Sequence, residues 1–164
     1  CKMALLTIFN KKSSTKTLSA SKVVKLKNVK YSPKVIIAWA KAIEGNVKIN
    51  TWLMKNGFIE LSVSVSAICL KDDARSWLMS NGYAHLFAMI NASEGNKKAQ
   101  TWLKKNNMIT FYHIAMAVEG EKASWSWIGQ NCGLEIFILA NSIKKIKDQI
   151  EENHNDPHYY GKDL

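Results

Sequence analysis

The chain has 164 residues, of which 47% are hydrophobic and 22% charged, so its composition fits one folded domain and excludes an intrinsically disordered protein. The longest apolar run, Val35–Ala40, is far shorter than the roughly 20 residues of a membrane-spanning helix, so we expect no transmembrane helix. The net charge of +10 comes almost entirely from one part of the chain. Residues 1–34 hold nine lysines and no acidic residue, and the remaining basic residues are nearly balanced by all 13 Asp and Glu.

Residues 1–18 form a predicted N-terminal arm, in which an apolar segment at residues 3–9 is followed by lysines. Such an arm could lie on an anionic membrane, with its apolar side chains inserted and its lysines on head groups. The lysines of residues 1–34 could equally neutralise nucleic-acid phosphates. Both partners remain alternatives to a solvated basic arm.

The three cysteines, Cys1, Cys69 and Cys132, are odd in number and lack metal or redox spacing. This pattern favours reduced thiols and a cytoplasmic protein. A chain that begins with Cys also permits the alternative of a lipid-anchored protein, in which Cys1 carries the lipid.

Residues 19–35 are predicted to be a degenerate N-terminal cap. The stretch at residues 19–28 has the character of an outer helix, and Ser32 followed by Pro33 is a typical start for the first inner helix.

Residues 36–135 consist of four ungapped repeats of 25 residues. An alanine recurs at the seventh position of each repeat, and a Thr-Trp or Ser-Trp pair is followed four residues later by asparagine. The four repeats carry Trp52, Trp77, Trp102 and Trp127, with Asn56, Asn81, Asn106 and Asn131. This regular spacing predicts one structural unit per repeat.

Each repeat is interpreted as two helices. The first half is apolar almost throughout, as a helix buried between neighbours requires, and the second half is amphipathic. Between them, Gly45, Gly95 and Gly120 can end the first helix in the left-handed conformation, and Asn46 and Asn96 can cap the second. The tryptophans are expected to pack in the core, and the recurrent Asn to bond a neighbouring repeat's backbone.

Residues 136–164 are predicted to form a C-terminal capping helix and tail. Lys144 and Lys145 replace the turn residues, so one helix should run from about Gly133 to Asn153. Its isoleucine-rich stripe would seal the last repeat, as the end of a repeat array requires.

The repeat resembles the helical half of an ankyrin repeat, as at Ala92, Gly95, Asn96, Ala99 and Leu103. The period of 25 is shorter than the ankyrin period of about 33 and leaves no residues for the projecting β-hairpin. The resemblance implies helical packing of the ankyrin type, and protein binding on a concave surface.

These patterns predict an all-α fold, a right-handed-type α/α solenoid of about four two-helix repeats with a long C-terminal capping helix. We expect a non-enzymatic scaffold that binds a protein or peptide on its concave face. The candidate contact residues, which depart from the repeat pattern, are Trp39, Tyr112, His113 and Trp125. His113 could instead be a satisfied core histidine, and Trp125 could pack against a neighbouring loop.

No phosphate-binding glycine loop, nucleophile elbow or His-Glu-x-x-His motif occurs. We therefore expect neither an enzyme, nor a cofactor, nor a small-molecule substrate. In the tail, Pro157 prevents His154 and His158 from lining one helix face, so no metal site is expected.

Overall fold

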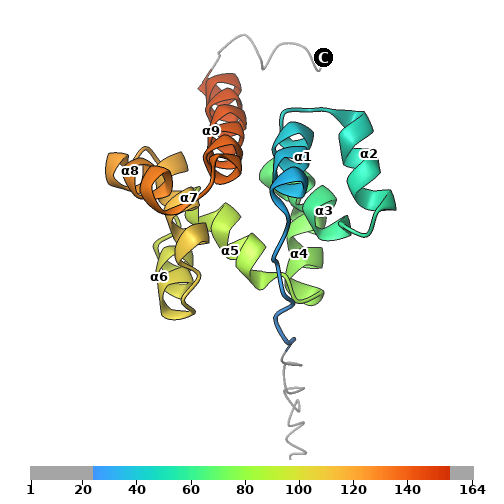
Figure 1. Ribbon diagram of the computed structural model, residues 1–164, viewed down its shortest axis with the longest axis horizontal. Helices are drawn as coiled ribbons and strands as arrows, with labels where there is room; N and C mark the ends of the chain where they lie inside the picture. Colours follow the sequence, from blue (N-terminus) through green and yellow to red (C-terminus); the bar gives the residue numbers. More distant parts are fainter. Residues whose placement is uncertain (1–23, 156–164) are drawn as a thin grey trace, which may run out of the picture.

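The computed structural model describes residues 24–155, which form nine helices and no strand (Figure 1). The bounds are α1 (Pro33–Ile43), α2 (Val47–Lys55), α3 (Ile59–Ile68), α4 (Asp72–Ser80), α5 (Ala84–Ala92), α6 (Lys97–Lys105), α7 (Ile109–Val118), α8 (Lys122–Asn131) and α9 (Leu134–Asn155). The predicted all-helical repeat fold is confirmed.

Consecutive helices pair as hairpins, with the odd-numbered helices inside and the even-numbered ones outside. Each outer helix packs on the inner helix of its own hairpin and on the next inner helix along the chain. In the described range the outer helices do not pack against one another. Every hairpin therefore relies on its neighbour to bury its apolar side, as in other repeat arrays.

The turns within the hairpins follow the predicted chemistry. Gly45, Gly95 and Gly120 have φ of 95°, 81° and 99°. The side chain of Asn46 accepts a hydrogen bond from the Ile49 amide at 3.1 Å, and that of Asn96 caps α6. Glycine and asparagine together thus allow the chain to reverse its direction within only a few residues.

The core is formed mainly by inner-helix residues and by one aliphatic residue from each outer helix. The recurrent alanines at positions 42, 67, 92 and 117 are at most 2% exposed, which explains their small size. The outer helices contribute the residue after each repeat tryptophan, namely Leu53, Leu78, Leu103 and Ile128, all at 0% exposure. Burial of such side chains is the main stabilising contribution in a small domain.

The last helix, α9, closes the array. It covers the predicted span from about Gly133 to Asn153 and packs on α7 and α8, as the capping prediction requires. It also packs extensively on α1, and the two helices lie side by side in Figure 1. The inner helices α1, α3, α5, α7 and α9 therefore form a closed ring.

The predicted outer helix at residues 19–28 is wrong in its described part. Val24–Ser32 is an extended segment without helix, and the helix begins at Pro33 as predicted. The reason is ring closure: α9 occupies the side of α1 on which a preceding repeat would have packed. Residues 1–23, with most of the predicted arm, and residues 156–164 lie outside the described range.

Candidate functional site

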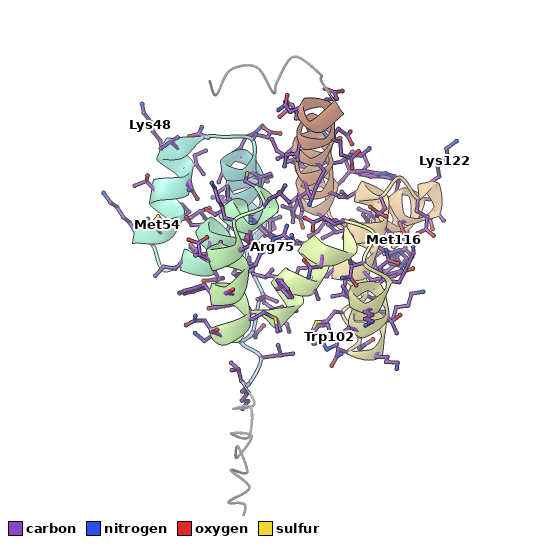
Figure 2. All side chains as sticks on the ribbon, turned by 180° about the vertical axis from the view of Figure 1, so that it is seen from behind. Lys48, Met54, Arg75, Trp102, Met116 and Lys122 are labelled. Carbon is purple, nitrogen blue, oxygen red and sulfur yellow. The ribbon has the colours of Figure 1, made fainter. Side chains whose placement is uncertain are left out.

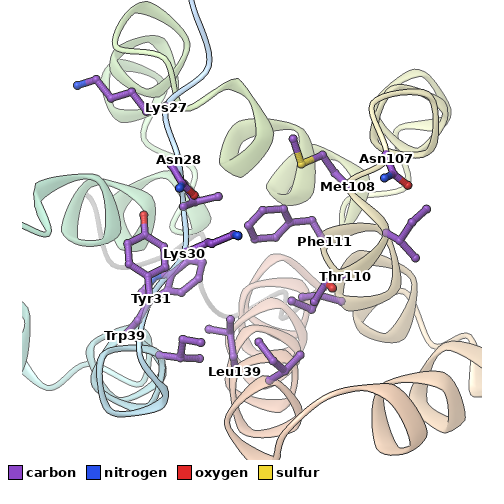
Figure 3. A pocket seen from close by; sticks show the side chains of 15 residues that line it. Lys27, Asn28, Lys30, Tyr31, Trp39, Asn107, Met108, Thr110, Phe111 and Leu139 are labelled. Atoms are coloured by element: carbon purple, nitrogen blue, oxygen red, sulfur yellow. The ribbon is translucent and has the colours of Figure 1, made fainter.

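The inner helices enclose a cavity at one end of the ring (Figure 3). Its volume is about 690 Å³. The N-terminal halves of α1, α7 and α9 form its walls, through side chains such as Trp39, Phe111 and Leu139. Most of the lining is aliphatic or aromatic, so the cavity suits an apolar group.

The extended segment Val24–Ser32 covers one side of this cavity. The Lys27 amide donates a hydrogen bond to the Gly82 carbonyl at 2.9 Å, and the Lys27 ammonium lies 5.0 Å from the centre of the Tyr83 ring. Further along, the Tyr31 hydroxyl donates to the Glu60 carboxylate at 2.8 Å. Two separate contacts therefore hold the segment on α3 and on the loop before α5.

Gly82 is needed for this contact. Its φ is +90°, and a Cβ added there would lie 2.7 Å from the Lys25 carbonyl oxygen. Gly57 occupies the same repeat position with a φ of +86°, but nothing lies within 4 Å of its added Cβ. The close approach of the segment thus distinguishes two otherwise equivalent glycines.

Two titratable side chains near the cavity, Tyr31 and His85, have pKa values shifted toward their neutral forms. Burial, and then the hydrogen bond to Glu60, raise the pKa of Tyr31 well above its usual range. Burial lowers the pKa of His85, which is 0% exposed. Neither ring nitrogen of His85 has a hydrogen-bond partner within the described residues. Burial therefore favours the neutral imidazole at this position.

Two lysines give the cavity its positive charge. Lys27 and Lys30, from the extended segment, belong to its lining, and both are exposed. The first turns of α1 and α7 also face this end, and neither helix has a side-chain cap on its N-terminal amides. Helix N-termini carry partial positive charge. The site is therefore apolar inside and weakly cationic at its edge.

The opposite end of the ring is closed by polar contacts from α9. The buried ammonium of Lys147 pairs with Glu94 at the end of α5, and Arg75 from α4 binds the same carboxylate. Ser142 donates to Glu44 at the end of α1, at 2.8 Å. Burial raises the pKa of Glu94, but Arg75 and Lys147 outweigh it, so the net pKa is lowered.

The four candidate contact residues do not form one site. Trp39 lies in the cavity wall, 1% exposed, and its indole N–H has no partner in the described part of the chain. Tyr112 and His113 lie together on α7, where the Lys104 ammonium is 4.3 Å from the Tyr112 ring centre. Trp125, on α8, makes an edge contact with Phe137 of α9, with ring centres 5.1 Å apart.

His113 is satisfied by its neighbours. Its ring stacks on Trp127 at 4.0 Å, and its Nδ1 is 2.9 Å from the Ser124 hydroxyl. Ser124 donates its own proton to Glu121, so His113 acts as the donor to the serine oxygen. This arrangement matches the alternative of a structural histidine.

The repeat tryptophans are less buried than expected for core residues. Trp52 is 45% exposed, and the other three are partly buried. Trp52 stacks on Phe58 and Trp77 on Tyr83, with ring centres about 6 Å apart in each pair. Trp52 and Trp77 thus cover the loop that leads into the next repeat, whereas Trp127 stacks on His113 of its own hairpin. In all four repeats the residue that follows the tryptophan enters the core.

The repeat asparagines bond their own helix rather than a neighbouring repeat. In each case the side-chain amide donates to the carbonyl of the tryptophan four residues earlier, at 2.8 or 2.9 Å. In the first three repeats the same carbonyl also accepts the backbone amide of the asparagine, so the side chain adds a second hydrogen bond at the helix C-terminus.

The sequence analysis missed the residues at the cavity end of the ring. Glu60, His85, Thr110 and Glu135 share one repeat position, near the start of successive inner helices. All four side chains are polar or charged between apolar neighbours, and a column of this kind is the signal that was available. Glu60 is 7% exposed and anchors Tyr31, and Thr110 lines the cavity.

Within residues 24–155, no group of three or more His, Cys, Asp or Glu side chains is arranged to hold a metal ion. In the same range, no helix combines the length and the apolar character needed to cross a membrane. Comparison with known proteins gave no matching family model, no matching curated protein and no matching solved structure.

Proposed function

We propose that this protein is a non-enzymatic helical-repeat module that binds an apolar segment of a protein or peptide on the inner face of its ring. The observation that carries the proposal is the apolar cavity of about 690 Å³ between α1, α7 and α9. A fold alone does not specify a function, so the argument depends on this site.

The size and chemistry of the cavity fit such a ligand. Its volume lies within the range of roughly 300–1,000 Å³ that is usual for ligand sites. The apolar walls suit one or two large side chains, and Lys27 and Lys30 at the edge suit a carboxylate next to them. The preferred ligand is therefore an apolar peptide segment with an acidic group or a free C-terminus.

The proposal can be tested by site-specific photo-crosslinking in extracts of cells that make the full chain. A photoreactive phenylalanine derivative replaces Ile109, which lines the cavity, or Ile59, which begins α3 at the same repeat position. Both side chains are exposed, at 36% and 46%. We expect a defined partner polypeptide to crosslink at position 109 and not at position 59.

A second measurement links the partner to the cavity. Thr110→Trp places a large ring within the cavity lining. It should therefore weaken the binding of the purified partner segment at least about tenfold. The proposal fails if both positions give the same products, or if position 109 crosslinks only to the chain's own residues 1–23.

A second candidate function is attachment to an anionic membrane or nucleic acid through the basic arm. It is favoured by Lys25, Lys27, Lys30 and Lys34, which are all exposed in the described part of that region. Full chain and a chain lacking residues 1–18 should differ in binding to anionic liposomes or RNA, and the difference should shrink at high salt. Equal weak binding by both chains would eliminate this function.

A further inference from the structure

The outer surface carries a groove that the proposed function does not use. It lies between the outer helices α4 and α6, over α5, and Figure 2 labels one residue of each bordering helix, Arg75 and Trp102. Two adjoining hollows of about 300 and 560 Å³ share Met79, Phe87 and Asn91. No extensive packing joins α4 to α6, and α5 lies between them in the described part of the chain.

The floor of this groove is apolar and open because of one small residue. Ala88 lies at the repeat position that His113 occupies in the next hairpin. There, His113 stacks on Trp127 and Tyr112 is covered by Lys104, so side chains fill the corresponding space. Over the α5–α6 hairpin, the hollow is bordered by Phe87, Trp102 and Met79 of α4. The small side chain of Ala88 leaves open the space that His113 occupies in the next hairpin.

One edge of the groove is strongly basic. Helix α6 carries four lysines and no acidic residue, and Lys98 lines the same hollow as Trp102. A shallower depression on α6 is lined by Lys97, Lys98 and Lys105. None of these three lysines has an ion-pair partner in residues 24–155. The basic edge is thus available to an acidic ligand.

The positions of two of these lysines are unfavourable for the helix itself. Lys97 and Lys98 lie in the first turn of α6, where the helix dipole favours acidic residues, and α4 has Asp72 and Asp73 at the same positions. Residues that oppose a local stability rule are concentrated at functional sites. The other edge of the groove has the opposite charge, because Asp72 lines it and Arg75 is engaged by Glu94.

We propose that the groove between α4 and α6 binds an amphipathic helical segment of a partner protein. Its apolar side chains enter the hollow between Met79, Phe87 and Trp102, and acidic residues along one edge pair with the lysines of α6. The opposite edge of the bound helix, which faces Asp72 of the groove, carries basic or neutral residues. This is helix-in-groove recognition, with charge setting the orientation of the ligand.

The test begins with a phage library of helical peptides, selected on the full chain and then measured as labelled peptides by fluorescence anisotropy. We expect enriched peptides to carry apolar residues three or four positions apart and acidic residues along one edge. Affinity should fall as salt increases, because the paired charges are exposed.

The repeat supplies matched control variants. Lys98→Glu should lower the affinity for the selected peptides about tenfold. Lys48→Glu, at the same position of α2, should leave that affinity within about twofold of the unchanged chain. Met79→Ala should weaken binding about fivefold, and Met54→Ala, again at the matched position, should have no effect. All four side chains are exposed, so the variants should fold.

Several outcomes would overturn the proposal. One is a set of enriched peptides without an acidic edge, or no enrichment at all. Another is an equal loss of peptide affinity in Lys48→Glu and Lys98→Glu. Displacement of the peptide by RNA or phosphatidylserine vesicles, with the same dependence on Lys98, would assign the basic edge to phosphate groups instead. If Thr110→Trp abolishes peptide binding while Met79→Ala does not, the peptides occupy the inner cavity, which supports the proposed function alone.

Discussion

The two ends of the inner ring are built from the same repeats but differ in chemistry. At the C-terminal end, cationic and amide side chains meet the helix carbonyls: Arg75 donates to the Ala67 carbonyl at 3.1 Å, and Gln100 to that of Ala92 at 3.2 Å. Lys147 from α9 adds an ion pair with Glu94. At the N-terminal end, an apolar cavity is covered by an extended segment held at two points.

We propose that the polar end serves the stability of the fold and the apolar end serves binding. The polar end fastens α9 across the ring. Its side chains also add a second donor to the Ala67 and Ala92 carbonyls, which already accept backbone amides. The apolar end contains the candidate site. Four experiments can challenge this division, and they follow in order of the effect that we expect.

The largest effect should come from Glu94→Ala. Lys147 is 7% exposed and would lose its carboxylate partner, so we expect about 3 kcal/mol less free energy of unfolding, measured in urea. Glu119 has the same repeat position and is exposed, and Glu119→Ala should cost about 0.5 kcal/mol or less.

The double variant Glu94→Ala with Lys147→Met tests the physical reason. Removal of the unpaired buried charge should restore at least about 1 kcal/mol of the lost stability. Equal losses in Glu94→Ala and Glu119→Ala would show that the polar end does not hold the ring.

A smaller effect is expected from Gly82→Ala at the cavity end. Positive φ alone should cost about 1 kcal/mol in the control Gly57→Ala. The contact of the new Cβ with the Lys25 carbonyl should bring the loss in Gly82→Ala to about 2 kcal/mol. Hydrogen exchange of the Lys27 amide should accelerate only in Gly82→Ala. Unchanged exchange there would mean that Gly82 does not hold the segment.

Tyr31→Phe removes the second contact of the extended segment. Glu60 is 7% exposed and would lose its hydroxyl donor, so we expect a loss of about 1.5 kcal/mol. Tyr112→Phe is a suitable comparison, because Tyr112 packs through its ring. A loss of the same size in both variants would argue against the importance of the Tyr31–Glu60 bond.

The smallest effect concerns pH. Because the folded pKa of Glu94 is lowered below the unfolded value of 4.5, its charge stabilises the fold above that pH. This contribution disappears as pH falls through the folded pKa. The stability difference between wild type and Glu94→Gln should therefore be constant from neutral pH to about pH 5 and shrink at lower pH. A difference that grows on acidification would contradict the ion pair.

Much of the fold could be predicted from local patterns. Gly45 and Asn46 act within one turn, and the Trp-Leu pair repeats in one phase, so the hairpins and their boundaries follow from neighbouring residues. The candidate site was predicted less well. Trp39 is the predicted contact residue that lies at the cavity. Tyr112 and His113 contact each other, His113 stacks on Trp127 of its own hairpin, and Tyr112 lies under Lys104 of the preceding hairpin. Their departure from the repeat pattern indicated local packing, which sequence alone does not distinguish from a binding site.

By itself, the sequence determined the helical hairpins, the stacking of repeats and the long last helix, because turn chemistry and the 25-residue apolar pattern act over short distances. Only the tertiary structure decided that α9 returns to α1 and that Val24–Ser32 is extended across the ring. Both depend on the small rotation between successive repeats, which adds up over the array and is encoded in no single repeat. The cavity between α1, α7 and α9 is a consequence of that closure.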